Sequence, residues 1–516
     1  MLPTVGGSIL GARGRVLAPQ GSGRLTASIL PAKTRWMKRP TTHSRAGPKP
    51  SSAARPPSQH AGPRRHGRER FDPLAQRTLA VADVAQLPVV RIKSAAWRPL
   101  VFRKQVLSVA PEAAPGDLVV LEDAAGQPLG YGLYNPFSEI VVRVLSPAGE
   151  PADEAFWQQR LERAVSLRRD LLHLDDASDA YRLVHAEGDG LSGLVADRLG
   201  DVLSIEVFSL AMYQRAAALA EWLAAHCGLA HWIVRASPRM HGQEGYLPPP
   251  LSSPEAPSQV TIRELGTRFR IRFAGGHKTG FFCDQRDNRR RLAELCRDRT
   301  VLDLCAYTGG FAIQAKRLGG ARAVTAVELD AEPLRLAREN ANMNQVRIDL
   351  VEADVFAYMR DMLRGGRQYD VVVLDPPKLI NTRRELEEGA RKHLDLNRLA
   401  MQLVRPGGLL LSCSCAGLLS EEAFLRLLYT AARQAGPPPS DVAGTAPNQP
   451  IATAPSGAGS GSGVAPSAAA ARSAHSSGAA GRTLQVLARS GAGPDHPVAA
   501  NYPESEYLKA VWMRVH

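Results

Sequence analysis

The stretch "VLDLCAYTGGFAIQAKRLGGARAVTAVELD", Val301 to Asp330, decides the fold that the sequence predicts. It opens with a short apolar strand that ends at Cys305, continues through the turn "AYTGG", and predicts a helix over 311–318. A second strand, over 323–327, ends on the acid Glu328. A strand, a glycine turn, a helix and a second strand form a parallel unit, in which a ligand binds at the carboxyl ends of the strands.

Two kinds of ligand compete for this turn. A nicotinamide dinucleotide needs the pattern G-x-G-x-x-G, and the turn lacks it. The pattern "D-x-x-x-x-T-G-G" with a later acid instead resembles the S-adenosylmethionine (SAM) loop of the class I methyltransferases. The resemblance implies SAM as cofactor. Its binding residues would be Tyr307, Thr308, Gly309 and Gly310 of the loop and Glu328, which can accept hydrogen bonds from both ribose hydroxyls.

The third strand adds another acid to the expected cofactor site. In "VEADVF", residues 351–356, Asp354 comes just after the strand. Class I methyltransferases have an acid here that accepts from the adenine amino group, and the resemblance implies that role for Asp354. The alternative is a solvated loop acid. Strands and helices alternate regularly from Val260 onward, which predicts an α/β fold with a doubly wound parallel sheet.

The motif "YDVVVLDPPKL", residues 369–379, ends a buried strand at Asp375 and stiffens the following turn with two prolines. An Asp or Asn before Pro-Pro resembles the base pocket of methyltransferases that act on nucleobases. The resemblance implies that Asp375 binds a flipped base and also borders the cofactor. Lys378 has three open roles: it can stabilise a thiolate, pair with an RNA phosphate, or be a plain surface lysine.

The motif "GGLLLSCSCAGLL", residues 407–419, predicts the next parallel strand and places Cys413 and Cys415 near the base pocket. Cytosine C5 is a poor nucleophile, and a thiolate that adds at C6 makes it reactive. Methylation of C5 therefore needs a cysteine beside the base. Residues i and i+2 of a strand share a face, so spacing does not choose between the two, and either cysteine could belong to the core.

Together these motifs resemble the bacterial 23S ribosomal RNA large-subunit cytosine-5 methyltransferases, which combine a PUA domain, a central domain and a SAM domain. The resemblance runs from Val89 to His516, interrupted by 436–481. Further matching motifs are "YRLVHAEGDGLSGLVADRLG" (181–200), "GGHKTGFFCDQRDNR" (275–289) and "DHPVAANYPESEYLKA" (495–510).

The family resemblance assigns roles to individual residues. It implies that Cys415 is the nucleophile and that Asp375 binds the cytosine amino group and N3, which favours the protonated ring and eases thiolate addition. It also implies that Asp284, Gln285 and Arg286 belong to a segment that closes over SAM.

The resemblance and the composition together predict four parts of the chain. Residues 89–146 alternate short β-like runs with turns, and 436–481 contains no aromatic residue and only two charges. We expect a disordered basic tail at 1–85, a PUA-like RNA-binding β-barrel at 86–148, a central α/β domain at 149–250, and a Rossmann-like class I methyltransferase domain at 259–516 with a disordered insertion at 436–481.

The predicted RNA contact of the barrel is "RIKSAAWRPLVFRK", Arg91 to Lys104, which holds five basic residues and two aromatics. Basic residues interleaved with aromatics suit a surface that binds the RNA backbone and stacks on bases. The stretch departs from the longer basic run usual in the family. The alternative is a solvated strand face.

The net charge of +14 is concentrated at the start of the chain. Residues 1–70 hold 14 of the 64 basic residues and one acid, Glu69, so the rest is close to neutral. An Arg- and Ser-rich segment without acids is typical of an organelle transit peptide, for mitochondrion or chloroplast, and a basic tail that touches RNA is the alternative. The six cysteines lack the C-x-x-C spacing of a structural zinc site, and no apolar run is long enough to span a membrane.

The sequence thus predicts a SAM-dependent RNA methyltransferase of an organelle. It would form 5-methylcytosine in large-subunit ribosomal RNA through a covalent bond between Cys415 and C6. Ribosomal RNA is the expected partner, a membrane is not, and a homodimer stays open beside a monomer. Two alternatives are a guanine-N7 or N2 ribosomal RNA methyltransferase, which needs no cysteine, and a non-catalytic RNA-binding ribosome-assembly factor.

Overall fold

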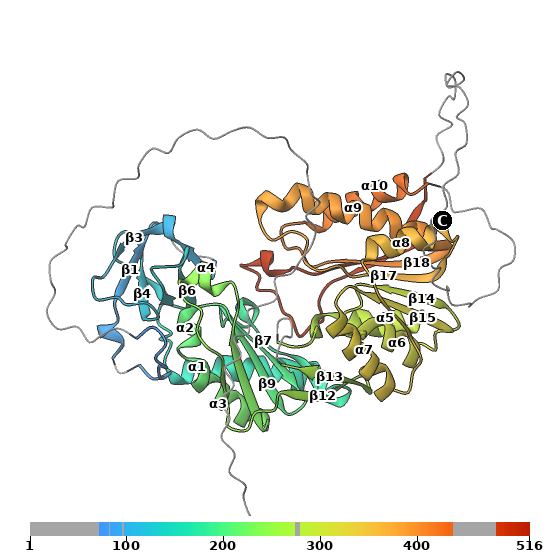
Figure 1. The fold of residues 1–516 in the computed structure, drawn as a ribbon. Helices are drawn as coiled ribbons and strands as arrows, with labels where there is room; N and C mark the ends of the chain where they lie inside the picture. The colour runs from blue at the N-terminus through green and yellow to red at the C-terminus, as the bar shows by residue number, and fades with distance from the viewer. Residues whose placement is uncertain (1–71, 82, 95–97, 274–278, 437–480) are drawn as a thin grey trace, which may run out of the picture. The chain divides into compact units, whose positions relative to one another are not determined.

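The computed structural model describes residues 72–516 except residue 82 and the segments 95–97, 274–278 and 437–480. The predicted basic segment 1–70 and nearly all of the predicted insertion therefore lie outside the described residues, as does Trp97. The described residues form sheets of six, five, two and seven strands (Figure 1).

The six-stranded sheet comes first in the chain and corresponds to the predicted run of short strands. Its strands are β1 (Val89–Ile92), β2 (Leu100–Phe102), β3 (Val106–Val109), β4 (Leu118–Glu122), β5 (Pro128–Tyr134) and β6 (Ile140–Pro147), in the order β2-β6-β5-β4-β1-β3. The sequence predicted β1, β4, β5 and β6. It did not indicate β2 and β3, which are short and lack an alternating pattern of buried and exposed residues.

The second sheet has the order β11-β10-β9-β8-β7 and packs with helices of its own. Its strands are β7 (Ala180–His185), β8 (Leu194–Leu199), β9 (Val202–Val207), β10 (His231–Ala236) and β11 (Leu251–Ser252), and its helices are α1 (Glu154–Ser166), α2 (Leu210–Tyr213), α3 (Ala216–Cys227) and α4 (Met240–Glu244). The short helix α2 starts at a cap, where Ser209 Oγ accepts from Met212 N–H at 3.3 Å, and the longer α3 follows it.

A hairpin, β12 (Gln259–Glu264) and β13 (Thr267–Arg272), leads into the seven-stranded sheet. The strands of that sheet are β14 (Thr300–Leu304), β15 (Ala323–Glu328), β16 (Asp349–Glu352), β17 (Tyr369–Leu374), β18 (Val404–Ser414), β19 (Leu484–Ser490) and β20 (Lys509–Val515). Its helices are α5 (Arg286–Glu294), α6 (Gly310–Arg317), α7 (Ala331–Met343), α8 (Val355–Arg364), α9 (Leu386–Leu403) and α10 (Glu421–Gln434).

The order of this sheet is β16-β15-β14-β17-β18-β20-β19. The first five strands are parallel, and β20 lies antiparallel between β18 and β19. The predicted doubly wound sheet is therefore confirmed. Its strands bury nearly continuous apolar runs such as residues 371–374, as expected of a parallel sheet covered on both faces.

The two ends of the predicted insertion meet at one point. The N–H of Arg482 donates to the carbonyl of Ala432 at 2.9 Å, and a Cβ on Gly481 would lie 2.5 Å from the carbonyl oxygen of Arg433. The chain therefore leaves the domain after α10 and returns beside the same helix before β19. A long connection is compatible with this arrangement because the entropy of closing a loop grows only slowly with its length.

Of the helices that the structure describes, none combines the length and the apolar character needed to cross a lipid bilayer.

Candidate active site

The residues that the sequence predicted around the cofactor and the base gather at one edge of the seven-stranded sheet. Strands β14 to β18 run parallel as neighbours, so their carboxyl ends share this edge. The residues placed there include Glu328, Asp354, Asp375 and Cys415. Burial, and then the charges of Glu328 and Asp375, raise the pKa of the Cys305 thiol well above its usual value, which shows that several acids converge here.

The loop after β14 has an uncommon backbone. Cys305 and Tyr307 adopt φ values of 63° and 50°, and Gly309 adopts 81°. Left-handed angles cost a residue other than glycine about 1–3 kcal/mol and cluster at functional sites. The N–H of Tyr307 donates to Glu328 Oε2 at 2.7 Å, and a Cβ on Gly309 would lie 3.3 Å from Ala337 Cβ. The loop is thus pinned between the end of β15 and helix α7.

The remaining loop residues contact α7 and α5. The carbonyl of Thr308 accepts from Asn340 Nδ2 at 3.3 Å. A Cβ on Gly310 would lie 3.2 Å from Arg289 Cδ, so glycine lets α6 begin against that side chain. Arg289 is itself fixed by a buried bidentate ion pair with Glu264, at 2.6 and 2.7 Å. The predicted glycines therefore serve close packing as well as any ligand.

The two predicted cofactor acids also carry local structure. Glu328 accepts from Tyr307 N–H through Oε2 and from the next two backbone N–H groups through Oε1, at 2.8 and 3.1 Å. A carboxylate has about four acceptor sites, so roughly one remains for a ribose hydroxyl. Asp354 caps α8, because its Oδ1 accepts from Ala357 N–H at 3.0 Å. Its Oδ2 makes no such cap bond.

Sequence reasoning missed Asp303, the first residue of the D-x-x-x-x-T-G-G pattern. It is fully buried in β14, and its Oδ2 accepts from Ala312 N–H at 3.0 Å. Its Oδ1 has no hydrogen-bond partner among the described residues. Burial, reinforced by Asp375 and Glu328, raises its pKa to about 7. A buried carboxylate oxygen without a donor suits a cationic ligand, and SAM carries a sulfonium and an ammonium group, so the site fits SAM.

Asp375 is half-buried and is held by a chain of amides. Gln285 Nε2 donates to Asp375 Oδ2 at 2.9 Å, and Asn288 Nδ2 donates to Gln285 Oε1 at 2.7 Å. Ser490 Oγ donates in turn to Asn288 Oδ1 at 2.7 Å. Gln285, predicted to belong to a segment over SAM, therefore contacts the carboxylate predicted to bind the base. The chain of bonds fixes which end of the Gln285 amide faces Asp375.

The other two residues of the predicted SAM segment are bound to the C-terminal part of the chain. Arg286 forms a buried bidentate ion pair with Asp495, at 2.9 and 3.0 Å. Burial lowers the pKa of Arg286, but the Asp495 carboxylate outweighs it and leaves that pKa raised. Asp284 is buried, and its Oδ2 accepts from the Tyr507 hydroxyl at 2.5 Å. Both contacts anchor the segment before β20 to α5 and the turn before it.

The two cysteines of the SCSCAG motif differ in exposure. Cys413 lies within β18, is fully buried and belongs to an apolar cluster with Leu411 and Trp512. Burial, and then the Asp375 charge, raise the pKa of its thiol well above the usual value. Cys415 follows the last residue of β18 and is only partly buried. Of the two cysteines of this motif, Cys415 is therefore the one that keeps exposed surface at the sheet edge.

The serines of the same motif face the opposite side of the strand. Ser412 Oγ donates to Asn397 Oδ1 at 2.6 Å, and Ser414 Oγ lies 3.2 Å from His393 Nε2. Burial, and then the Lys509 charge, lower the pKa of His393 to about 4, so its ring is neutral near pH 7. Because side chains alternate between the two faces of a strand, the serines face α9 and the cysteines face the other side.

Lys509 is a second residue that sequence reasoning missed. It is the first residue of β20, pairs in register with Ser414, and is buried, with Nζ donating to the carbonyl of Ala416 at 2.8 Å. Burial lowers the pKa of Lys509, whereas the neighbouring Cys415 raises it and the neighbouring Lys378 lowers it further. Both lysines therefore lie near Cys415. No local pattern marks Lys509, because 94 positions separate it from Cys415 along the chain.

The predicted basic patch is largely occupied by contacts within its own sheet. Arg91 pairs with Glu122 at 2.9 Å, and Arg103 donates to the carbonyls of Pro136 and Ser138 at 2.7 and 2.8 Å. Arg98 is different, because its partner Glu504 lies in the segment before β20, at 2.8 Å.

Family profiles match most of the described chain. The profile "S-adenosylmethionine-dependent methyltransferase" matches residues 181–438, and the profile "PUA-like domain" matches residues 95–147. The chain is also similar to proteins named ribosomal RNA large subunit methyltransferase I. The Salmonella arizonae protein is 32% identical over 427 residues, which cover 81% of this chain and 93% of that protein. The Klebsiella pneumoniae (strain 342) protein is 32% identical over 431 residues, which cover 81% and 94%.

Solved structures share the fold. A structure described as a SAM-dependent methyltransferase from Streptococcus mutans has a TM-score of 0.62 at 19% identity, covering 83% of this chain and 99% of that one. A methyltransferase structure that contains SAH has a TM-score of 0.61 over the same shares. These likenesses confirm the predicted fold class, a PUA-like β domain joined to a class I methyltransferase sheet.

Proposed function

Since the chain belongs to the family of ribosomal RNA large subunit methyltransferase I and is a SAM-dependent methyltransferase, we propose that it forms 5-methylcytosine in large-subunit ribosomal RNA. The observation that carries the proposal is the partly exposed residue Cys415, at the same sheet edge as Asp375 and the loop after β14. A guanine methyltransferase or a scaffold has no need for a thiol at this position.

The proposed reaction begins with addition of the Cys415 thiolate to C6 of the cytosine, which makes C5 nucleophilic. Bound SAM supplies the methyl group as an electrophile. After C5 is methylated, a base removes the C5 proton, the electron pair restores the C5–C6 double bond, and the Cys415 thiolate leaves. The ring thus regains its aromatic character, and Cys415 is regenerated for the next turnover.

Asp375 is proposed to activate the base. A carboxylate beside N3 favours the protonated ring, and protonation draws electron density away from C6 before the thiolate adds. The Gln285 amide, which donates to Asp375 Oδ2, holds the carboxylate in one orientation.

Lys509 is proposed to stabilise the thiolate form of Cys415. A nearby cation favours a cysteine anion, and burial strengthens the interaction because the local dielectric is low. The Ala416 carbonyl, which accepts from Lys509 Nζ, fixes the ammonium one residue beyond Cys415. Lys378 adds a second, exposed cation to the same region.

The test compares the two cysteines. Cys415→Ser should lower methylation of ribosomal RNA by at least about a thousandfold, because the hydroxyl is a much weaker nucleophile. Cys413→Ala is the matched control and should retain activity. Transfer of tritium from labelled SAM to RNA measures both. RNA with 5-fluorocytosine at the target should form a covalent adduct with the parent protein only, because the C5 fluorine cannot leave as a proton.

Other outcomes of these experiments would support one of the two alternative functions. Undiminished methylation by Cys415→Ser, with methylguanine in the RNA digest, would establish the guanine-N7 or N2 reaction instead. RNA binding without any tritium transfer from the parent protein would establish a non-catalytic assembly factor.

The acid-poor segment 1–70 extends the proposal to a location, the ribosome of a mitochondrion or chloroplast. Bisulfite sequencing of organellar and cytosolic large-subunit RNA, with and without the protein, measures it. A 5-methylcytosine that disappears from organellar RNA alone supports this location, and one that disappears from cytosolic RNA alone rejects it.

A further inference from the structure

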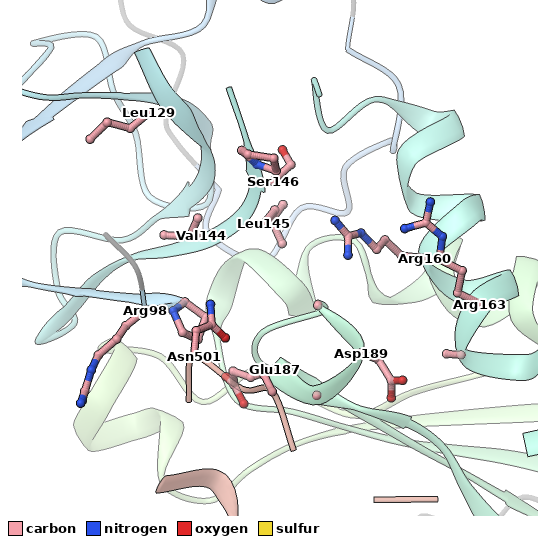
Figure 2. A pocket seen from close by; sticks show the side chains of 16 residues that line it. Arg98, Leu129, Val144, Leu145, Ser146, Arg160, Arg163, Glu187, Asp189 and Asn501 are labelled. Atoms are coloured by element: carbon pink, nitrogen blue, oxygen red, sulfur yellow. The ribbon is translucent and has the colours of Figure 1, made fainter. Parts of the chain in front are cut away.

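A cavity of about 560 Å³ is lined by residues other than those of the candidate active site (Figure 2). Its walls come from strands β5 and β6, helix α1, the loop after β7, and the segment before β20. The residues that matter for the argument are Arg98, Arg160, Arg163, Leu129, Val144 and Asn501. The volume is within the usual range of about 300–1,000 Å³ for pockets that bind small molecules or single groups of a larger one.

Two acids border the cavity, and both already have partners. Asp189 accepts from the buried Arg168 at 2.7 and 2.9 Å. Glu187 accepts from Ser192 Oγ at 2.8 Å and lies 3.8 Å from Arg143. Both carboxylates are therefore neutralised by Arg168 and Arg143, which lie behind the cavity wall, and not by a group in the cavity.

Three arginines at the cavity are bound much less firmly. Arg98 pairs with Glu504, but both side chains are about half exposed, and exposed pairs contribute only about 0–1 kcal/mol. Arg160 approaches Glu150 no closer than 3.6 Å. Arg163 is exposed and forms no ion pair with any residue in the described part of the chain. An anion in the cavity would give these arginines strong ion pairs in place of weak ones.

Arg160 is held ready for such a ligand. Its guanidinium lies over the Phe156 ring, with Cζ 5.0 Å from the ring centre, and against Gly190, where a Cβ would be 3.0 Å from Nη1. Gly190 has φ 71° and leaves the room that the guanidinium needs. Arg160 Nε is buried without a hydrogen-bond partner among the described residues. The guanidinium is therefore held at the cavity wall by packing rather than by a strong ion pair.

Leu129 and Val144 contribute apolar surface on the β5 and β6 side of the cavity, which Ser146 also lines, and Arg160 and Arg163 of α1 lie on the other side in Figure 2. Apolar surface opposite arginines suits a ligand with a flat unsaturated ring and an attached phosphate. Both parts occur in one nucleotide.

The cavity is also connected to the candidate nucleophile. Asn501 lines the cavity. Three residues later, Glu504 lies beside the end of the SCSCAG motif, because a Cβ on Gly417 would be 4.0 Å from the Glu504 carbonyl oxygen. One short segment before β20 therefore touches both the cavity and the turn that follows Cys415. A chain of nucleotides could occupy both places at once.

We propose that this cavity binds one nucleotide of the substrate RNA outside the methylated cytosine, with the phosphate on Arg160 and Arg163 and the base against Leu129 and Val144. The proposal rests on the proposed function, because that function makes RNA the substrate. It explains why Arg98, alone among the described arginines of the predicted patch, points toward the segment before β20.

The test measures RNA binding without SAM, so that it does not depend on catalysis. Arg163→Ala and Arg160→Ala should each weaken binding of a ribosomal RNA fragment roughly tenfold and reduce the slope of log K against log salt by about 1, since each removes one phosphate contact. Arg160→Lys should recover part of the affinity. Arg426→Ala is the matched control, because Arg426 is an exposed helix arginine paired with Glu422, and it should bind RNA like the parent.

Two outcomes would overturn the proposal, and a third separates it from the proposed reaction. Parent-like affinity and salt slope in folded Arg163→Ala and Arg160→Ala proteins would show that no phosphate binds there. Tight binding of free cytidine monophosphate that these variants lose, with RNA affinity unchanged, would make the cavity a site for free nucleotides instead. Failure of the methylation test together with weaker RNA binding by the variants would leave the cavity proposal standing and remove only the proposed reaction.

Discussion

Two neighbouring regions differ in how firmly their arginines are paired. Around Asp495 three arginines have buried contacts: Arg286 pairs with its carboxylate, the Arg168 side chain donates to its carbonyl at 2.6 Å, and the backbone N–H of Arg182 donates to Oδ2 at 2.9 Å. At the cavity between α1 and β6, Arg160 and Arg163 have exposed partners or none. The comparison indicates that buried, fully paired arginines hold the parts of the chain together, and that weakly paired ones are available to a ligand.

The largest effect on stability should come from breaking the buried ion pair between Arg286 and Asp495. Asp495→Asn leaves Arg286 as an uncompensated buried charge, and loss of one partner of such a pair typically costs about 3–5 kcal/mol. We expect the free energy of unfolding to fall by that amount near pH 7, measured by urea denaturation. An unchanged denaturation midpoint would show that the pair contributes nothing to stability.

The same variant should also change the response to acid. Burial opposes ionisation of Asp495, but His496 and Arg286 outweigh it and hold its pKa well below the usual 3.8. Since the folded pKa is depressed, the stabilisation is present above about pH 4 and disappears as the pH falls toward the folded value. The gap in stability between parent and Asp495→Asn should therefore shrink below pH 4.

A middle-sized effect should come from Lys509, a buried cation with Cys415 among its neighbours. Lys509→Gln keeps a donor for the Ala416 carbonyl but removes the charge. We expect methylation at pH 7 to fall about tenfold, with recovery at higher pH, because less Cys415 is present as thiolate near neutrality.

The pH dependence of Cys415 alkylation by iodoacetamide measures this effect directly. Its midpoint should move upward in Lys509→Gln and return toward the parent value in Lys509→Arg. Identical profiles for the three proteins would assign Lys509 a purely structural role.

The smallest effect should come from Arg91, which belongs to the predicted basic patch but pairs with Glu122 on the surface. Arg91→Ala should change RNA affinity by less than about twofold and stability by no more than about 1 kcal/mol. Filter binding and thermal denaturation measure the two. A tenfold loss of RNA affinity would move the main RNA contact from the cavity to the strand face predicted from sequence.

Much of the methyltransferase sheet was predictable because its signals are local. The strands ending at Glu328 and Leu374 are short apolar runs closed by an acid or a proline turn, and the structure ends them where the pattern did. The order of parallel strands then brings Glu328, Asp354, Asp375 and Cys415 to one edge, as predicted. Strands β2 and β3 were not predicted, because runs of three or four residues without alternating burial carry no periodic signal.

The sequence by itself determined the chemistry that is available: a glycine loop, acids at strand ends, and two cysteines two positions apart. Only the tertiary structure decided which of the two cysteines keeps exposed surface, that Lys509 lies beside it, that Asp303 has an oxygen without a donor, and which arginines already have partners. The physical reason is that residue type and local pattern fix backbone conformation over a few residues. Burial and charge pairing, in contrast, depend on segments such as 495–509 that reach the site from far along the chain.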